Sequence, residues 1–215
     1  MKTYRGGRRV MRGVLIGVLV LAVAVLIGVA IVLVPILTHQ SAGGSGNVVP
    51  DDIVSEASAE GADDRTRVLS VETTAGVPAD LATLSPGDEL VVRGSGFDSR
   101  IGMYVSICKV PDVAGEKPGP CLGGLPEGAM EGEAAGAESA ASSAWITDDW
   151  AWRAFATKGF DNPRTGSFEV RLLVANPTQE GLDCTTERCA VTTRADHTAS
   201  QDRVQDMQLP VRFAD

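Results

Sequence analysis

The densest group of residues that could carry out chemistry lies near the C-terminal end of the chain, between positions 194 and 206. A serine, a histidine and an aspartate could form a nucleophilic triad, and several acids with a histidine could bind a cation. Neither pattern has its expected context, because there is no G-x-S-x-G motif and the acids lack the spacing of a calcium loop. We therefore expect a hydrogen-bonded loop in which Asp196 and Asp202 pair with Arg194, Arg203 or His197. We predict that the protein is not an enzyme.

A second group gathers every tryptophan of the chain within eight residues, beside two acids. Tryptophan with adjacent charge is enriched at binding hot spots, so this stretch could form a recognition surface. The alternative is that the rings cover the open edge and fill the core of a small domain with few other aromatic residues, and we favour this packing interpretation. Together with the histidine of the first group, the candidate ligand- or partner-binding residues are Trp145, Asp148, Asp149, Trp150, Trp152 and His197.

Four cysteines occur in two close pairs, Cys108 with Cys121 and Cys184 with Cys189. An even count in an exported domain points to disulfides, although the sequence alone allows three pairings. Zinc is the competing interpretation. We disfavour it because there is no C-x-x-C pair and no neighbouring histidine cluster. We expect neither a metal nor a cofactor.

These residues need an element that places them in an oxidising compartment, and the N-terminal region provides one. From Gly13 to Leu37 the sequence has 25 residues without a charge, enough for a helix that crosses a bilayer. A cleaved signal peptide usually has a shorter apolar stretch, so an uncleaved signal-anchor is favoured. Five basic residues lie within positions 1–12, which should form a cytoplasmic tail under the positive-inside rule. The expected location is the cell membrane, with a single pass and the C-terminal domain outside the cell.

Charge and composition divide the rest of the chain. The formal net charge is −9, and the basic tail leaves −14 for the residues after position 12. An acidic domain repels nucleic acid, which we exclude as a partner. Residues 38–67 are rich in Gly, Ser, Ala and acids and lack apolar periodicity, so we expect a flexible linker. The folded domain is expected over residues 68–215.

Short β-branched runs separated by Gly and Pro turns predict an all-β domain, with the spacing typical of a sandwich. Between the third and fourth runs lies a low-complexity insertion near 125–144, which should be mobile and exposed. We expect strands at Val68–Thr73, Glu89–Gly94, Met103–Lys109, Ser167–Val174, Cys189–Thr193 and Met207–Phe213.

Three segments carry a resemblance to a known family: L-S-P-G-D-E-L-V-V-R-G-S-G-F from Leu84, G-S-F-E-V-R-L-L-V from Gly166, and D-C-T-T-E-R-C-A-V from Asp183. With the two cysteine pairs, they resemble the neocarzinostatin family of actinomycete apoproteins. The resemblance implies a seven-stranded immunoglobulin-like sandwich with Cys108–Cys121 and Cys184–Cys189 disulfides, in an actinobacterial membrane-anchored surface protein. It also implies a ligand cleft near the first disulfide. The enediyne ligand of that family is not carried over, because the middle segment differs in length and composition.

Two functions follow as hypotheses. The first is a non-catalytic binding or interaction module outside the cell, for a small apolar ligand, an envelope component or a neighbouring protein. The second is an accessory subunit, in which the helix docks into a larger respiratory or transport assembly.

Overall fold

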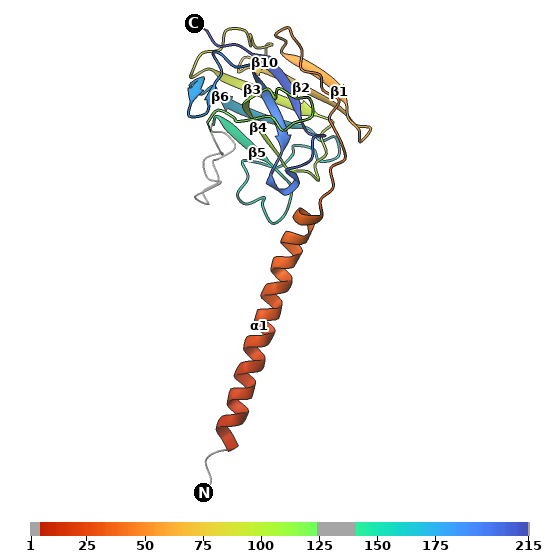
Figure 1. The fold of residues 1–215 in the computed structure, drawn as a ribbon, viewed down its shortest axis with the longest axis vertical. Coiled ribbons are helices and arrows are strands. Elements are labelled where there is room, and N and C mark those ends of the chain that lie inside the picture. The colour runs from red at the N-terminus through yellow and green to blue at the C-terminus, as the bar shows by residue number, and fades with distance from the viewer. Residues whose placement is uncertain (1–4, 124–140, 215) are drawn as a thin grey trace. The chain divides into compact units, whose positions relative to one another are not determined.

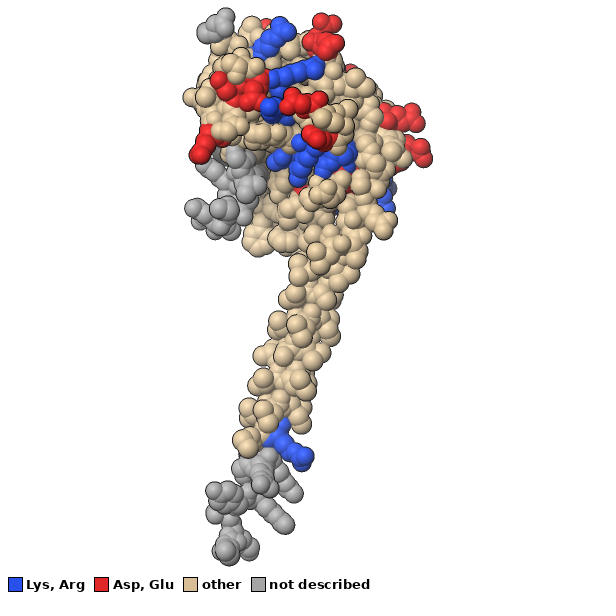
Figure 2. All heavy atoms as spheres, viewed as in Figure 1, with Lys and Arg blue, Asp and Glu red and all other residues tan. Residues whose placement is uncertain are grey.

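A computed structural model describes residues 5–123 and 141–214. The chain forms two compact units, residues 1–39 and residues 40–215. The first unit is the helix α1, Arg5–Thr38, which includes Pro35 in its last turn. Its 28 residues from Met11 to Thr38 are long and apolar enough to cross a membrane, as the sequence predicts. Figure 2 shows a helix surface without acidic or basic side chains over most of its length, whereas both kinds are mixed on the β unit.

The second unit is built from antiparallel sheets (Figure 1). The first sheet has the order β1-β2-β3-β6 and the second has the order β10-β9-β4-β5. A third sheet is the small hairpin β7-β8. The strand bounds are β1 Glu56–Glu60, β2 Thr66–Thr73, β3 Glu89–Ser95, β4 Met103–Lys109, β5 Ser143–Ile146, β6 Phe168–Leu173, β7 Thr178–Gln179, β8 Leu182–Asp183, β9 Cys189–Ala195 and β10 Met207–Val211.

One hydrophobic core joins the two four-stranded sheets. Alternate residues of each strand contribute to it, as the period of two in a β-strand requires. Leu69 and Val71 of β2 and Leu90 of β3 meet residues of the second sheet such as Val105 and Ile107 of β4. The prediction of a mainly β-sheet domain is confirmed, and the six expected strands correspond to β2, β3, β4, β6, β9 and β10.

The expected count of seven strands differs from the structure, which has ten strands in three sheets among its described residues. The sequence did not indicate β1, β5, β7 or β8. β7 and β8 have only two residues each, too few to show a period in the sequence. β5 follows directly on an alanine- and serine-rich tract, which hides its start.

The linker prediction is wrong for residues 56–60 and 66–67, which lie in β1 and β2. Residues 56–60 form β1, which pairs in register with β2 from Glu56 opposite Ser70 to Glu60 opposite Thr66. The backbone N–H of Ala42 already donates to Asp202 Oδ2 of the β unit, at 3.2 Å. Composition predicted flexibility because this stretch cannot bury much of its own surface, but pairing with an existing sheet stabilises it. The insertion prediction falls mostly on residues outside the described ranges, and its last two positions, Ser143 and Ala144, are buried in β5.

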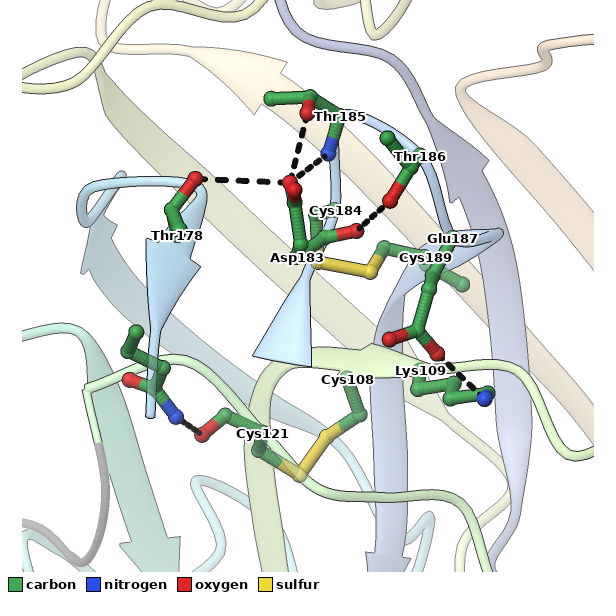
Figure 3. Close-up of a disulfide and its surroundings, with 12 residues drawn as sticks. Cys108, Lys109, Cys121, Thr178, Asp183, Cys184, Thr185, Thr186, Glu187 and Cys189 are labelled. Atoms are coloured by element: carbon green, nitrogen blue, oxygen red, sulfur yellow. Dashed lines mark hydrogen bonds and ion pairs between the residues drawn. A yellow bond between two sulfur atoms is a disulfide. The ribbon is translucent and has the colours of Figure 1, made fainter. Parts of the chain in front are cut away.

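Two disulfides brace the β unit, and they are the pairs that the family resemblance implies (Figure 3). Cys108–Cys121 ties β4 to the segment that follows it, and Cys184–Cys189 closes the turn before β9. Asp183 organises that turn by accepting hydrogen bonds from the N–H and hydroxyl of Thr185, at 2.9 and 2.6 Å. The cysteines therefore serve as structural crosslinks.

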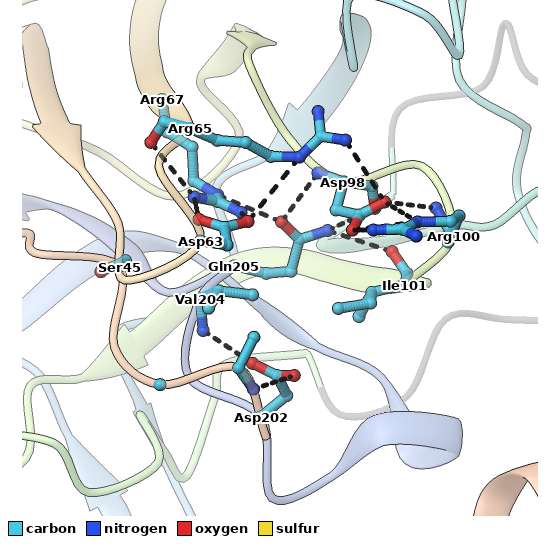
Figure 4. A network of polar contacts seen from close by, with 12 residues as sticks. Ser45, Asp63, Arg65, Arg67, Asp98, Arg100, Ile101, Asp202, Val204 and Gln205 are labelled. Atoms are coloured by element: carbon cyan, nitrogen blue, oxygen red, sulfur yellow. Dashed lines mark hydrogen bonds and ion pairs between the residues drawn. The ribbon is translucent and has the colours of Figure 1, made fainter. Parts of the chain in front are cut away.

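A buried polar network connects the β1–β2 hairpin to the loops at one end of the second sheet (Figure 4). Arg67 is fully buried and donates to both carboxylate oxygens of Asp63, at 2.8 and 2.6 Å. Its Nε also donates to Gln205 Oε1, while the Gln205 amide donates to the carbonyls of Asp98 and Ile101. The guanidinium holds the pKa of Asp63 below its usual value. Because every partner is hydrogen-bonded, the buried charge is tolerated.

Candidate functional site

An aromatic cluster lies on the outer face of the second sheet, on the side away from the core. It consists of Tyr104, Trp145, Trp152 and His197, and we call it the ring cluster. Trp152 and His197 meet edge to face with ring centroids 4.7 Å apart, and Trp145 and His197 do so at 5.1 Å. The Tyr104 and Trp145 centroids are 5.8 Å apart. Such distances and tilts are the favoured geometry for aromatic pairs.

Strand alternation explains why two of these rings lie outside the core. In β4, Met103, Val105 and Ile107 face the core, so Tyr104 and Ser106 face the other way. In β5, Ala144 and Ile146 face the core, so Trp145 faces outward. Tyr104 and Trp145 are direct partners in the β4–β5 register, which brings their rings together.

Loops supply the other two rings. Trp152 comes from the segment between β5 and β6, and His197 begins the short 3₁₀ helix η1, His197–Ala199, after β9. Asp196 caps this helix and accepts hydrogen bonds from the N–H and hydroxyl of Thr198, at 2.8 and 2.6 Å. The sequence order Asp-x-Thr at the start of a turn is typical of such a cap.

Asp196 also fixes the position of Trp145. It is fully buried, and its Oδ2 accepts a hydrogen bond of 2.9 Å from the indole N–H of Trp145. A glycine is required beside it, because a Cβ at position 102 would lie 2.0 Å from Asp196 Oδ2. The backbone N–H of Asp196 donates to the Gly102 carbonyl at 2.8 Å. One carboxylate thus orients both the helix that carries His197 and the ring that packs against it.

The electrostatics of the ring cluster keep Tyr104 neutral. Burial raises the pKa of Tyr104 to about 12, and the nearby Asp196 carboxylate adds to the rise. The Tyr104 hydroxyl and His197 Nδ1 are 2.9 Å apart and share a hydrogen bond. The guanidinium carbon of Arg194 lies 5.9 Å from the centre of the Tyr104 ring, which is cation–π geometry. Burial lowers the pKa of Arg194, whose Nη1 donates to the Pro118 carbonyl at 2.8 Å.

This arrangement offers a ligand stacking surfaces and polar contacts. Of the predicted residues, His197 is exposed, Trp152 is half-buried and Trp145 is buried.

Comparison of the chain with family models, curated proteins and solved structures finds no match. The neocarzinostatin resemblance therefore stays a prediction.

The remaining predicted residues lie apart from the rings or shape the loop that carries Trp152. The Trp150 side chain is 75% exposed. Asp148 Oδ1 accepts a hydrogen bond from the Phe160 N–H at 3.2 Å, and Asp149 Oδ1 accepts one from the Ala151 N–H at 2.8 Å. Both acids therefore organise the turn between β5 and β6.

The polar run near the C-terminus forms a hydrogen-bonded loop, and its acids also bond residues outside the run. Asp196 bonds Trp145 and Thr198, and Asp202 accepts from the N–H groups of Ala42 and Val204. Arg203 pairs with Asp206 at 3.0 Å. The expected pairs were taken from neighbours in the sequence, whereas the structure brings in β5 and the segment before β1. Over the described ranges, no group of three His, Cys, Asp or Glu residues could hold a metal ion.

Sequence reasoning missed Tyr104 as a site residue, and it assigned Arg194 to an ion pair with Asp196 or Asp202 instead of to the ring cluster. Tyr104 lies on an expected strand, at a position that alternates with core residues, whereas Arg194 lies one residue beyond the expected strand Cys189–Thr193 and within β9 of the structure. They are cross-strand partners in the β4–β9 register, which puts the guanidinium over the ring. Alternation around Val105 could have placed Tyr104 on the outer face. The contact between Tyr104 and Arg194 could be predicted only with knowledge of the strand order, which makes β4 and β9 neighbours.

Proposed function

We propose that this chain is a single-pass membrane protein whose β unit lies outside the cell and acts as a non-catalytic binding or interaction module. The apolar helix and the five basic residues before it support the orientation, since positive charge is retained in the cytoplasm. The two disulfides support an oxidising compartment for the β unit.

The observation that carries the binding proposal is the position of the ring cluster. Four rings gather on the outer face of a sheet whose opposite face already fills the core. The group includes an exposed histidine, with Arg194 above one ring. Aromatic side chains with a polar tip are common at recognition surfaces, since they offer a large contact area at small entropic cost.

The expected ligand is a small, mostly apolar molecule or an envelope component that stacks on these rings. Cys108 is four residues after Tyr104 in β4, so both side chains lie on the same face of the sheet, and Cys108 bonds to Cys121 there. This agrees with the cleft that an immunoglobulin-type, neocarzinostatin-like sandwich would have near its first disulfide. The bonding of Asp196 to Trp145 and Thr198 supports a positioning role for that acid rather than catalysis.

Purification from native membranes tests this proposal. The full chain is extracted in detergent, and copurifying small molecules and proteins are identified by mass spectrometry. Trp152→Ala should lose the bound molecule, because Trp152 is a half-buried ring of the cluster, whereas the matched variant Trp150→Ala should retain it. Identical material on both variants and on the unsubstituted chain would contradict a site at the ring cluster.

Two controls address location and the role of the helix. On intact cells, added protease should cleave the β unit but not the N-terminal tail, and protection of the β unit would refute the orientation. Replacing α1 with an unrelated membrane helix should leave the copurifying material unchanged. Loss of all partners in that exchange would instead favour the accessory-subunit function.

A further inference from the structure

The Trp150 loop, which we define as residues 147–157 between β5 and β6, displays two aromatic rings that the ring cluster does not use. The side chain of Trp150 is 75% exposed and that of Phe155 is 44% exposed. Every other Trp and Phe among the described residues is buried or half-buried. Single apolar residues are common on protein surfaces, whereas large rings grouped in one segment mark a contact with a partner or a lipid surface.

Hydrogen bonds hold this loop in one shape. The N–H of Trp152 donates to the Asp149 carbonyl at 3.1 Å, and the N–H of Phe155 donates to the Trp152 carbonyl at 2.9 Å. The Trp152 ring meets His197 in the ring cluster. Trp152 therefore anchors the middle of the loop, while the rings on either side of it stay exposed. A surface that is ordered before contact loses little conformational entropy when it binds.

Strand pairing places the Trp150 loop at the same end of the second sheet as η1. Met103 of β4 is opposite Ile146, the last residue of β5, and also opposite Ala195, the last residue of β9. The Trp150 loop follows β5 and η1 follows β9, so both segments leave the sheet at this end.

The chain also enters the β unit at this end. The N–H of Ala42 donates to Asp202 Oδ2 at 3.2 Å, and the N–H of Asp202 donates at 2.8 Å to the carbonyl of Ala199, the last residue of η1. The first residue of η1 is His197, which contacts Trp152 of the loop. An unbroken series of contacts thus connects the entry point of the chain with the Trp150 loop.

Only a short tether joins this entry point to the helix. The apolar stretch of the sequence ends at Leu37, and α1 ends at Thr38. Residues 39–41 lie between Thr38 and Ala42, and four peptide units span at most about 14 Å. A helix that crosses the bilayer, as in the proposed function, ends near the lipid surface. The connectivity of the chain therefore keeps the entry point close to that surface, whatever the orientation of the β unit.

The chemistry of the loop suits the boundary between lipid and water. A tryptophan ring has an apolar body and one N–H donor, so it is enriched where acyl chains meet headgroups. The neighbouring side chains of Asp148, Asp149 and Arg153 are exposed and carry both signs of charge, so they can stay hydrated beside the headgroups. Because two acids precede Trp150, attraction to anionic headgroups is a poor driving force, and the contact should be apolar and independent of lipid charge.

We propose that the Trp150 loop inserts Trp150 and Phe155 into the headgroup region of the bilayer that α1 crosses, and so holds the β unit on the lipid surface. The inference rests on the membrane-spanning helix of the proposed function but not on any ligand of the ring cluster. The bilayer is favoured over a soluble partner because the tether keeps it within reach of the loop at all times.

Tryptophan fluorescence of the full chain in phosphatidylcholine nanodiscs tests the proposal. All three tryptophans lie within residues 145–152, so α1 contributes nothing to this signal. Lipids brominated near the headgroup quench a ring that they touch, and we expect them to lower the emission relative to unbrominated discs. Lipids brominated near the end of the acyl chain should quench much less, because the ring lies at the interface.

Two variants locate the quenched ring. Trp150→Phe should remove most of the quenching, and it should not disturb the fold because the ring is exposed. The matched variant Trp152→Phe makes the same chemical change two positions away, at a ring that packs against His197, and it should retain the quenching.

Three results would overturn the proposal. The first is equal emission of the unsubstituted chain in brominated and unbrominated discs. The second is undiminished quenching in Trp150→Phe. The third is an emission that responds to the number of chains per disc instead of to bromination, which would assign the loop to a second copy of the chain.

These results are separable from the tests of the proposed function. Quenching in a nanodisc does not depend on which side of the cell membrane the β unit faces, so a wrong orientation in the cell would leave the quenching unchanged. Absence of quenching would in turn leave the protease and copurification results unchanged. A chain that does not enter the discs at all would refute the membrane-spanning helix, and this inference with it.

Discussion

The hydrogen bond between Trp145 and Asp196 makes a quantitative prediction for the replacement Trp145→Phe. The indole is 3% exposed and the carboxylate is fully buried, with 2.9 Å between Nε1 and Oδ2. Removing the indole N–H leaves a buried acceptor with one donor fewer, and hydrogen bonds to charged groups contribute about 1.5–3 kcal/mol. We therefore expect the free energy of unfolding to fall by about 2 kcal/mol.

Urea unfolding of the full chain in detergent micelles, with disulfides intact and far-UV circular dichroism as the signal, measures this loss. The matched control is Trp150→Phe, which makes the same chemical change at a ring that is 75% exposed. A surface substitution of this kind should change the free energy of unfolding by less than about 0.5 kcal/mol.

A double-mutant cycle separates the hydrogen bond from the loss of ring volume. Asp196→Asn keeps an acceptor at the same position but removes its charge, so Trp145→Phe should cost about 1 kcal/mol less in that background. Equal losses for Trp145→Phe and Trp150→Phe would refute the reasoning, because the hydrogen bond would then make no net contribution.

Three further outcomes follow from the fold. Arg67→Met should lower the free energy of unfolding by about 3–5 kcal/mol, because it leaves the buried partners of Arg67 without their hydrogen-bond donors. The control Arg93→Met should lower it by at most about 1 kcal/mol, because the ion pairs of Arg93 are exposed. Urea unfolding measures both values. Asp206 has a pKa of about 7 in the folded protein against about 3.9 in the unfolded chain, so folding favours its protonated form. The free energy of unfolding should therefore fall as the pH rises from about 4 to about 7 and then level off. In urea unfolding at a series of pH values, Asp206→Asn should not show this fall. Replacing Cys184 and Cys189 together by serine should lower the free energy of unfolding by about 2 kcal/mol, since the crosslink spans a sequence separation of only 5, and an unchanged midpoint in thermal unfolding would contradict this.

Much of the fold could be predicted because six strands carry strong local signals. The alternation from Phe168 to Leu173 and the turn at Ser85–Asp88 follow directly from strand period and turn chemistry. β1 could not be predicted in this way. Its sequence Glu-Ala-Ser-Ala-Glu has poor strand propensity, and it forms because β2 offers a free edge.

The candidate site was predictable only in part. Local composition marked Trp145, Trp152 and His197, but it could not show that η1 packs against the turn after β5. That contact joins residues 45 positions apart and depends on the order β9-β4-β5 within the sheet. The sequence could not show that one side-chain oxygen each of Asp206 and Gln208 lacks a hydrogen-bond donor, because this depends on how the folded chain packs around them.

The edge strands β1 and β10 bear on self-association of the chain. Two copies of a β domain can pair through their sheet edges, because an open strand edge is a template for aggregation. β1, the edge of the first sheet, is only five residues long and has a glutamate at each end. At the edge of the second sheet, β10 contains Pro210, which has no N–H to offer another strand. Strand pairing between copies of the chain should therefore be disfavoured at these two edges, β1 and β10.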